Sequence, residues 1–273
     1  MLQRQLGVQA HCLRFRIAAG LEAALREVRE LNLAAIELVS FPGCRGNAWG
    51  DFGAATDWPP QKIGHTIHAA GLACPGAMVT PAEIAESRLE TTVEWLRSAG
   101  IPRLILSSLP GAGTRTMADW RQGFASLNAL GERLRGRGLD FAYHTQPDLW
   151  RAINGVFPAD ELLQIIDPAL CRIEFDPSGP IIYGTDPAQY IAQRPECFYA
   201  LHLRDGTQPP APVFYLAAEV LGTGTIRWDA LLGAAGDSAM EWYFLEMEVA
   251  DAPQTLAALA ASLRFLRAQG LVH

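Results

Sequence analysis

Short apolar segments alternate with longer amphipathic segments along all 273 residues, and this alternation restricts the fold more than any other feature. Eight segments have the length and character of buried strands: 6–13, 34–40, 72–79, 103–109, 139–145, 171–177, 199–205 and 242–248. Eight others have the pattern of helices: 18–32, 59–70, 81–99, 116–137, 158–167, 186–194, 226–236 and 253–269. Such alternation predicts parallel strands joined by helical crossovers.

Two parallel architectures are compatible with this order. A doubly wound open sheet is the main alternative, but the first predicted strand is not followed by a GxGxxG turn, and eight repeats are enough to close a barrel. No Ser/Gly-rich linker, charge block or low-complexity tract divides the chain. We therefore expect an α/β protein whose residues 1–273 form a single (β/α)₈ TIM-barrel domain.

Composition narrows the classes of function. A hydrophobic share of 49% predicts a large core, and a net charge of −7 argues against a nucleic-acid surface. Lys62 is the only lysine and lies near the start of a predicted helix, which argues against Schiff-base chemistry.

The five cysteines are odd in number and form no CxxC pair, so reduced core thiols are expected. The N-terminal segment MLQRQLGVQAHCLRF lacks the apolar stretch of a signal peptide, and no segment approaches the roughly 18 apolar residues of a membrane span. These features predict a cytoplasmic protein without membrane or nucleic-acid partners, and they leave a homo-oligomer open.

Four residues that can bind a divalent metal stand on four successive predicted strands: His144, Asp176, His202 and Glu246. A barrel brings the carboxyl ends of its strands to one mouth, where active sites form. Two imidazoles and two carboxylates suit Mn²⁺, Zn²⁺, Co²⁺ or Mg²⁺. The plainer alternatives are a core histidine at position 202 and an ion pair between Glu246 and a nearby arginine.

Neighbouring acids on the same strands are candidates for supporting roles. Glu174 lies two residues before Asp176, and Glu248 lies two residues after Glu246, so the two acids of each pair share one face of a strand. Each pair therefore requires a cation, an arginine or an opening of the pore. Glu37, on the second predicted strand, is expected to contact either the substrate or neighbouring strands.

Two residues shortly after His202, at positions 204 and 205, are also candidates. Arg204 shares its parity and is expected either to hold an anionic substrate group or to pair with Glu246 or Asp176. Asp205 lies on the opposite strand face and would orient His202 only if the following loop turned back.

Long connections follow three predicted strands, at 41–58, 146–157 and 206–225, and therefore lie at the expected mouth. Aromatic residues that would anchor lids or ordinary loops occur there: Trp49, Trp58, Trp150, Phe157 and Tyr215. The glycine-rich LGTGT at 221–225 is weak evidence for a phosphate cradle, and an ordinary loop is favoured.

Over essentially its whole length the chain resembles the xylose-isomerase-like TIM barrels, the sugar phosphate isomerase/epimerase superfamily. The segments that carry the resemblance are, in order, GVQAHCLR, LNLAAIEL, GERLRGRGLDFAYHT, RIEFDPSG with GTDPAQY, YALHLRDG, LGTGTIRWDALL and WYFLEME. Family metal ligands are commonly Glu, Asp, His and Glu at the ends of strands five to eight. The last three match Asp176, His202 and Glu246, whereas His144 stands at the first position.

Other positions also depart from the family pattern. The run YHTQPDLW has Gln146 and Leu149 where one branch of the family has a second His and a Glu, and Gly179 stands where a His often follows the Asp. The many further ligands of the endonuclease IV branch are missing.

The resemblance implies a metal-dependent sugar or sugar-phosphate isomerase or epimerase that abstracts a proton next to a carbonyl. Because His144 replaces the first glutamate, Glu246 is the only matching acid that can act as base, with Arg204 steadying a substrate oxygen. Two alternatives stay open: a dehydratase of the inosose or 3-dehydroshikimate type, and a carbohydrate-binding barrel without turnover. The expected ligand is a small carbohydrate or keto acid.

Overall fold

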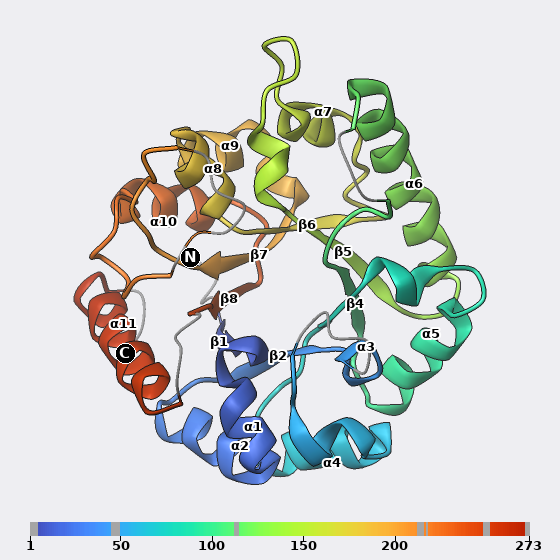
Figure 1. Cartoon of the computed structure of the whole chain (residues 1–273), viewed down its shortest axis with the longest axis vertical. Helices are drawn as coiled ribbons and strands as arrows, with labels where there is room; N and C mark the ends of the chain where they lie inside the picture. The colour runs from blue at the N-terminus through green and yellow to red at the C-terminus, as the bar shows by residue number, and fades with distance from the viewer. Residues whose placement is uncertain are drawn as a thin grey trace.

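Eight parallel strands form one closed barrel in the order β1 to β8, with helices around the outside (Figure 1). The computed structural model describes residues 5–44, 50–111, 115–211, 216, 218–247 and 252–270. The strands are β1 (Gln5–Gln9), β2 (Ala35–Val39), β3 (Ala77–Val79), β4 (Arg103–Leu106), β5 (Asp140–His144), β6 (Arg172–Phe175), β7 (Phe198–Leu203) and β8 (Trp242–Leu245). The predicted (β/α)₈ barrel is confirmed.

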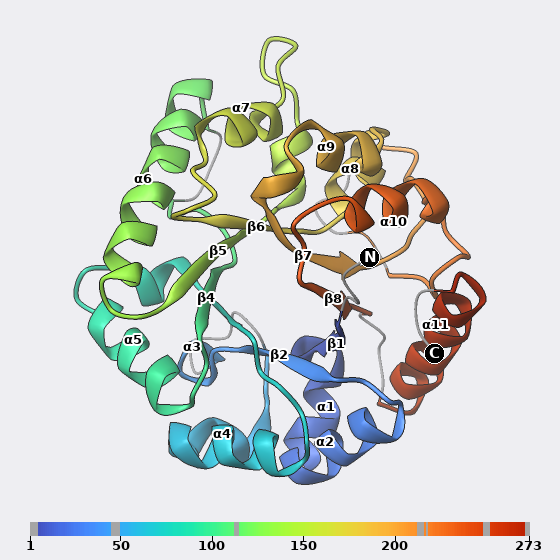
Figure 2. The same ribbon diagram turned by 180° about the vertical axis from the view of Figure 1, so that it is seen from behind.

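A ring of helices covers the barrel, and the view from behind shows the same arrangement (Figure 2). The described α-helices are α1 (Arg14–Ala19), α2 (Leu21–Glu30), α3 (Phe41–Cys44), α4 (Pro60–Ala69), α5 (Leu89–Ser98), α6 (Met117–Arg135), α7 (Pro158–Ile165), α8 (Ser178–Tyr183), α9 (Pro187–Gln193), α10 (Trp228–Gly236) and α11 (Ala252–Ala268). Short 3₁₀ turns complete the connections: η1 (Ala10–Leu13), η2 (Gly53–Asp57), η3 (Pro81–Ile84), η4 (Pro147–Trp150) and η5 (Pro195–Cys197). Within the described residues, no helix is long and apolar enough to cross a membrane.

The predicted helix at 81–99 is wrong at its start. The capping box of Thr80 and Glu83 is present, but it caps only the four-residue turn η3, and α5 begins at Leu89. Glu83 is buried and also accepts a hydrogen bond of 2.5 Å from Ser40 Oγ, at the end of β2. The box therefore joins two strand ends of the barrel instead of starting a long helix.

Strand register defines which side chains fill the barrel. Gln9 pairs with Glu37, His144 with Glu174, and His202 with Phe244, so the two members of each pair face the same side of the sheet. His202 on β7 contacts Glu37 on β2, and these two strands are not neighbours. Such a contact is possible only across the interior, so these positions point into the barrel.

Candidate metal centre at the barrel mouth

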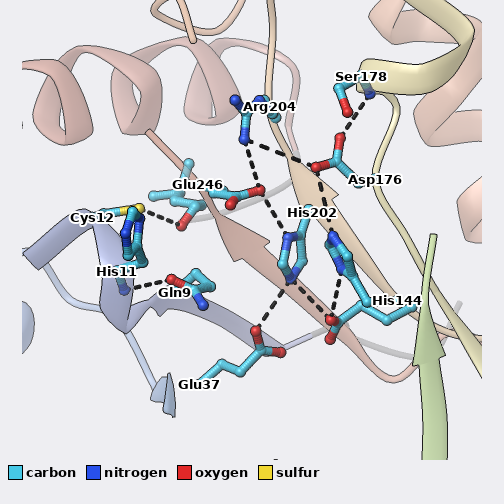
Figure 3. A network of polar contacts seen from close by, with 12 residues as sticks. Gln9, His11, Cys12, Glu37, His144, Asp176, Ser178, His202, Arg204 and Glu246 are labelled. Atoms are coloured by element: carbon cyan, nitrogen blue, oxygen red, sulfur yellow. Dashed lines mark hydrogen bonds and ion pairs between the residues drawn. The ribbon is translucent and has the colours of Figure 1, made fainter. Parts of the chain in front are cut away.

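The four predicted ligands gather at the carboxyl ends of β5 to β8. His144 ends β5, Asp176 follows β6, His202 lies in β7 and Glu246 follows β8, and all four are buried. Figure 3 shows their side chains directed toward one another. His144, Asp176 and His202 each offer a ligand atom, and these three atoms lie within 4.8 Å of one another. Glu246 Oε2 lies 2.9 Å from His202 Nδ1.

Glu174 and Glu37 lie deeper in the barrel and contact the inner nitrogens of the two histidine rings. Glu174 Oε2 is 3.1 Å from His144 Nδ1 and 3.3 Å from His202 Nε2. Glu37 Oε1 is 3.2 Å from the same Nε2. A carboxylate on one ring nitrogen fixes the tautomer of a histidine and directs its other nitrogen toward a metal.

The outer nitrogens face the predicted carboxylate ligands. His144 Nε2 lies 3.9 Å from Asp176 Oδ2, and His202 Nδ1 lies against Glu246. The contacts therefore divide into an inner set that holds the imidazoles and an outer set that offers two nitrogens and two carboxylates. The outer set has the donor chemistry of a Mn²⁺ or Zn²⁺ site.

A second group with metal-binding donors lies in the inner set, because Glu37, Glu174 and His202 also bring their ligand atoms within 4.8 Å. Glu37 Oε2 and Glu174 Oε1 are buried without a hydrogen-bond partner in the part of the chain that the structure describes. Four buried carboxylates thus converge on two imidazoles.

These neighbours raise the pKa values of His202 and Glu37, for different reasons. Burial lowers the pKa of His202, but the carboxylates of Glu174, Glu246 and Glu37 outweigh burial and hold this pKa well above its ordinary value. Burial and the negative charge of Glu174 raise the pKa of Glu37 well above its usual range. The site is thus held together by charge compensation.

Asp176 and Glu246 respond differently to the same surroundings. Burial would raise the pKa of Glu246, but Arg204 and His202 hold it well below its ordinary value, so its carboxylate is ionised. Burial and the nearby Glu246 raise the pKa of Asp176, against the lowering effect of Arg204.

Arg204 lies between the two outer carboxylates. Its Nη1 is 3.4 Å from Glu246 Oε2 and 3.9 Å from Asp176 Oδ2, and its Nη2 donates to the Leu216 carbonyl at 2.6 Å. The arginine therefore pairs with the acids of the site, as one of the two expectations had it. A contact between Arg204 and an anionic substrate group stays a prediction.

Asp205 does not support His202. Its Oδ2 accepts hydrogen bonds from the amides of Gly222 and Gly224, at 2.8 and 3.2 Å, and from Trp228 Nε1 at 2.8 Å. The loop after β7 returns to the opposite face of the strand, as alternation requires, so the proposed orienting role is wrong. The amides of Gly222 and Gly224 in the LGTGT segment thus already donate to a carboxylate of the protein. These contacts agree with the interpretation of this segment as an ordinary loop.

A buried tryptophan accounts for one departure from the family pattern. A side-chain Cβ at Gly179 would lie 2.2 Å from the ring of Trp150, so a larger residue does not fit there. Trp150 in turn packs against Phe175 and Tyr190, with ring centroids 5.9 and 5.3 Å apart. Gln146, at the other altered position, donates from Nε2 to the Ser107 carbonyl at 2.6 Å and links two strand ends.

Sequence reasoning missed one interior residue at the mouth. Gln9 ends β1, is 1% exposed and points inward by its register with Glu37. The alternation of side chains along the first predicted strand was the signal that could have identified Gln9 as an inward-facing residue. Glu248, Trp49 and Tyr215, which the sequence also singled out, lie outside the described residues.

Solved structures with the same fold include proteins of the predicted kind. A sugar phosphate isomerase/epimerase from Parabacteroides distasonis is 18% identical, with 99% of this chain and 100% of that chain covered and a TM-score of 0.79. A xylose isomerase-like TIM barrel protein from Mycobacterium smegmatis in complex with magnesium is 14% identical, with 98% and 96% covered and a TM-score of 0.67. The IOLI protein with a binding zinc atom is 12% identical, with 96% and 97% covered and a TM-score of 0.72.

Sequence comparisons give no such match. No protein-family model matches the chain, and neither does any curated protein. The likeness therefore lies in the three-dimensional structure, and at these identities it establishes the fold. The chain has the fold of the sugar phosphate isomerase/epimerases and xylose isomerase-like TIM barrels.

Proposed function

We propose that the protein is a metal-dependent isomerase or epimerase that moves a proton next to the carbonyl of a small carbohydrate or keto acid. One observation carries the proposal: Glu37, Glu174, Asp176 and Glu246 are all buried around two histidines, with Arg204 as the permanent positive charge beside them. Buried carboxylates in such number are costly unless a cation compensates them. A divalent ion meets that need.

The residues present fit a metal at the outer set. His144, Asp176, His202 and Glu246 would hold it, and the mixed nitrogen and oxygen donors favour Mn²⁺ or Zn²⁺, with Co²⁺ and Mg²⁺ as further candidates. When bound, the ion would polarise a substrate carbonyl and so acidify the neighbouring carbon. Glu174 and Glu37 would hold the two imidazoles in place from the inner side.

Glu246 is the best-placed base among the four acids. At 8% exposure it is the most accessible of them, whereas Glu37 and Glu174 are fully buried. Its Oε2 is held by His202 and Arg204, which leaves the other carboxylate oxygen to take the proton. The low pKa of Glu246 keeps it ionised but weakens it as a base, so the substrate carbon itself has to be made more acidic.

A dehydratase is the second candidate, because His144 replaces the first glutamate of the family pattern and leaves Glu246 as the one glutamate of the outer set. One base is enough to remove a proton whose loss expels a hydroxyl group from the adjacent carbon. A binding barrel without turnover is the third.

A panel of keto-sugars, inososes and hydroxypyruvate tests these candidates. Each compound is incubated with Mn²⁺-loaded protein in D₂O and followed by NMR. Metal-dependent exchange of a proton next to the carbonyl supports the isomerase, and loss of a hydroxyl group supports the dehydratase. Ligand-induced thermal shifts without exchange would contradict both enzymes. We also propose a cytoplasmic single-domain protein, for which the oligomeric state stays open.

A further inference from the structure

We propose that Gln9 is a substrate-binding residue whose carboxamide NH₂ donates a hydrogen bond to a substrate oxygen beside Glu246. The inference deepens the proposed function and rests on it. It depends on where Gln9 lies in the barrel, on how its amide is oriented and on what the opposite wall lacks.

Gln9 occupies the mouth position between the strand of Glu246 and the strand of Glu37. In the closed barrel β1 pairs with β8 on one side and β2 on the other, with Val8 beside Leu245 and Gln9 beside Glu37. Figure 3 shows Gln9 between His11 and Glu37, on the same side of His202 as Glu246. A substrate held at the outer set therefore has Gln9 as its neighbour on the β1 side.

The orientation of the Gln9 amide is fixed by the protein. Its Oε1 accepts a hydrogen bond of 2.5 Å from the backbone N–H of His11. Because a backbone N–H can only donate, the oxygen must be the atom at that end and the NH₂ the atom at the other. Among the described residues, the hydrogen bond recorded for the Gln9 side chain is the one at Oε1, and Nε2 is not one of the fully buried polar atoms that lack a partner. The NH₂ therefore lies at the end of an inward-facing side chain, turned away from His11, where a substrate oxygen can accept its hydrogen bond.

The wall of the barrel formed by β1 to β4, across from the outer set, offers few other donors to a substrate. The four residues of the outer set come from β5 to β8, so we expect β1 to β4 to supply further contacts to a substrate held there. The inward positions near the mouth on these strands are, by register and alternation, Gln9, Glu37, Val39, Met78, Ile105 and Ser107. Glu37 is engaged with His202, and the apolar side chains have no donor. Ser107 has a hydroxyl donor but follows β4, which is not next to β8 in the barrel. Gln9 thus supplies the inward-facing amide donor on β1, the strand next to β8 and Glu246. Removal of a proton next to a carbonyl places negative charge on its oxygen, which an N–H donor stabilises.

The test separates the donor from the acceptor of Gln9. Acetohydroxamate, a small ligand with two oxygens on neighbouring atoms, is titrated into Mn²⁺-loaded protein, and Mn²⁺ affinity is measured separately by calorimetry. Gln9→Met removes both functions, whereas Gln9→Glu keeps the acceptor for His11 and removes the NH₂. We expect both variants to bind acetohydroxamate about tenfold more weakly. Mn²⁺ affinity of Gln9→Met should stay within about twofold of the unmodified chain.

Gln146→Met is the matched control, because Gln146 lies at the same mouth but its Nε2 is already bonded to Ser107. It should change probe affinity by less than about threefold. Unchanged probe affinity in Gln9→Met, or its recovery in Gln9→Glu, would overturn the inference and leave the proposed function intact. A matching loss of Mn²⁺ affinity in Gln9→Met would assign Gln9 to the metal site instead. Failure of the unmodified chain to bind Mn²⁺, or of the loaded chain to bind the probe, would overturn both proposals.

Discussion

At the residue scale, we propose two functions for Glu246, as metal ligand and as base, and one substitution separates them. Glu246→Gln keeps the shape and one possible ligand oxygen but cannot accept the proton. We expect proton exchange in the substrate panel to fall by at least about 10²-fold, with part of the Mn²⁺ affinity retained. Glu241→Gln is the control, because Glu241 pairs with Arg172 away from the mouth. Near-normal exchange in Glu246→Gln would move the base elsewhere, with Glu174 next.

Glu174 contacts both histidines without belonging to the outer set, which makes it a test of indirect support. Glu174→Gln replaces the carboxylate that faces His144 Nδ1 and His202 Nε2. We expect Mn²⁺ affinity to fall by roughly 10- to 100-fold, the usual cost of losing such a partner. Calorimetry on this variant beside His202→Ala gives the comparison. An affinity equal to that of the unmodified chain would show that the imidazoles need no carboxylate behind them.

Asp205 is important at the scale of the element, because it fastens the loop after β7 to the start of α10. Its carboxylate accepts hydrogen bonds from two loop glycines and from the Trp228 side chain, and Asp205 is fully buried. Asp205→Ala should lower the free energy of unfolding by about 3 kcal/mol in denaturant titrations, because several buried donors lose a charged acceptor. Asp186→Ala, which removes the N-cap of α9 and an exposed ion pair with Arg227, should cost about 1 kcal/mol. Equal costs would contradict the anchoring role.

At the scale of the whole molecule, we expect the buried carboxylates to link stability to metal binding. Adding free Mn²⁺ at about 1,000 times its dissociation constant should stabilise the fold by about 4 kcal/mol, because the ion binds the folded chain alone. Thermal scans with Mn²⁺ and with a chelator measure the shift in Tm. His202→Ala should abolish that shift. If the variant and the unmodified chain shift equally, the stabilising ion binds somewhere other than the proposed site.

The sequence by itself determined the barrel and the strand ends that carry the proposed ligands. Strand and helix periodicities are local properties, and parallel strands bring their carboxyl ends to one mouth, so His144, Asp176, His202 and Glu246 had to be near each other. Local patterns also had limits. The capping box at Thr80 is present, but Glu83 also accepts a hydrogen bond from Ser40 at the end of another strand, and the box caps only the short turn η3.

Only the tertiary structure decided how the site is built. Parity placed Glu174 and Asp176 on one face but did not say that Glu174 would lie behind the two imidazoles and Asp176 in front. Glu37 reaches His202 across 165 residues of chain, and Asp205 turns to a loop instead of to His202. Such contacts depend on barrel closure, side-chain rotamers and loop paths. These are non-local, so the spacing of residues along the chain carries no record of them.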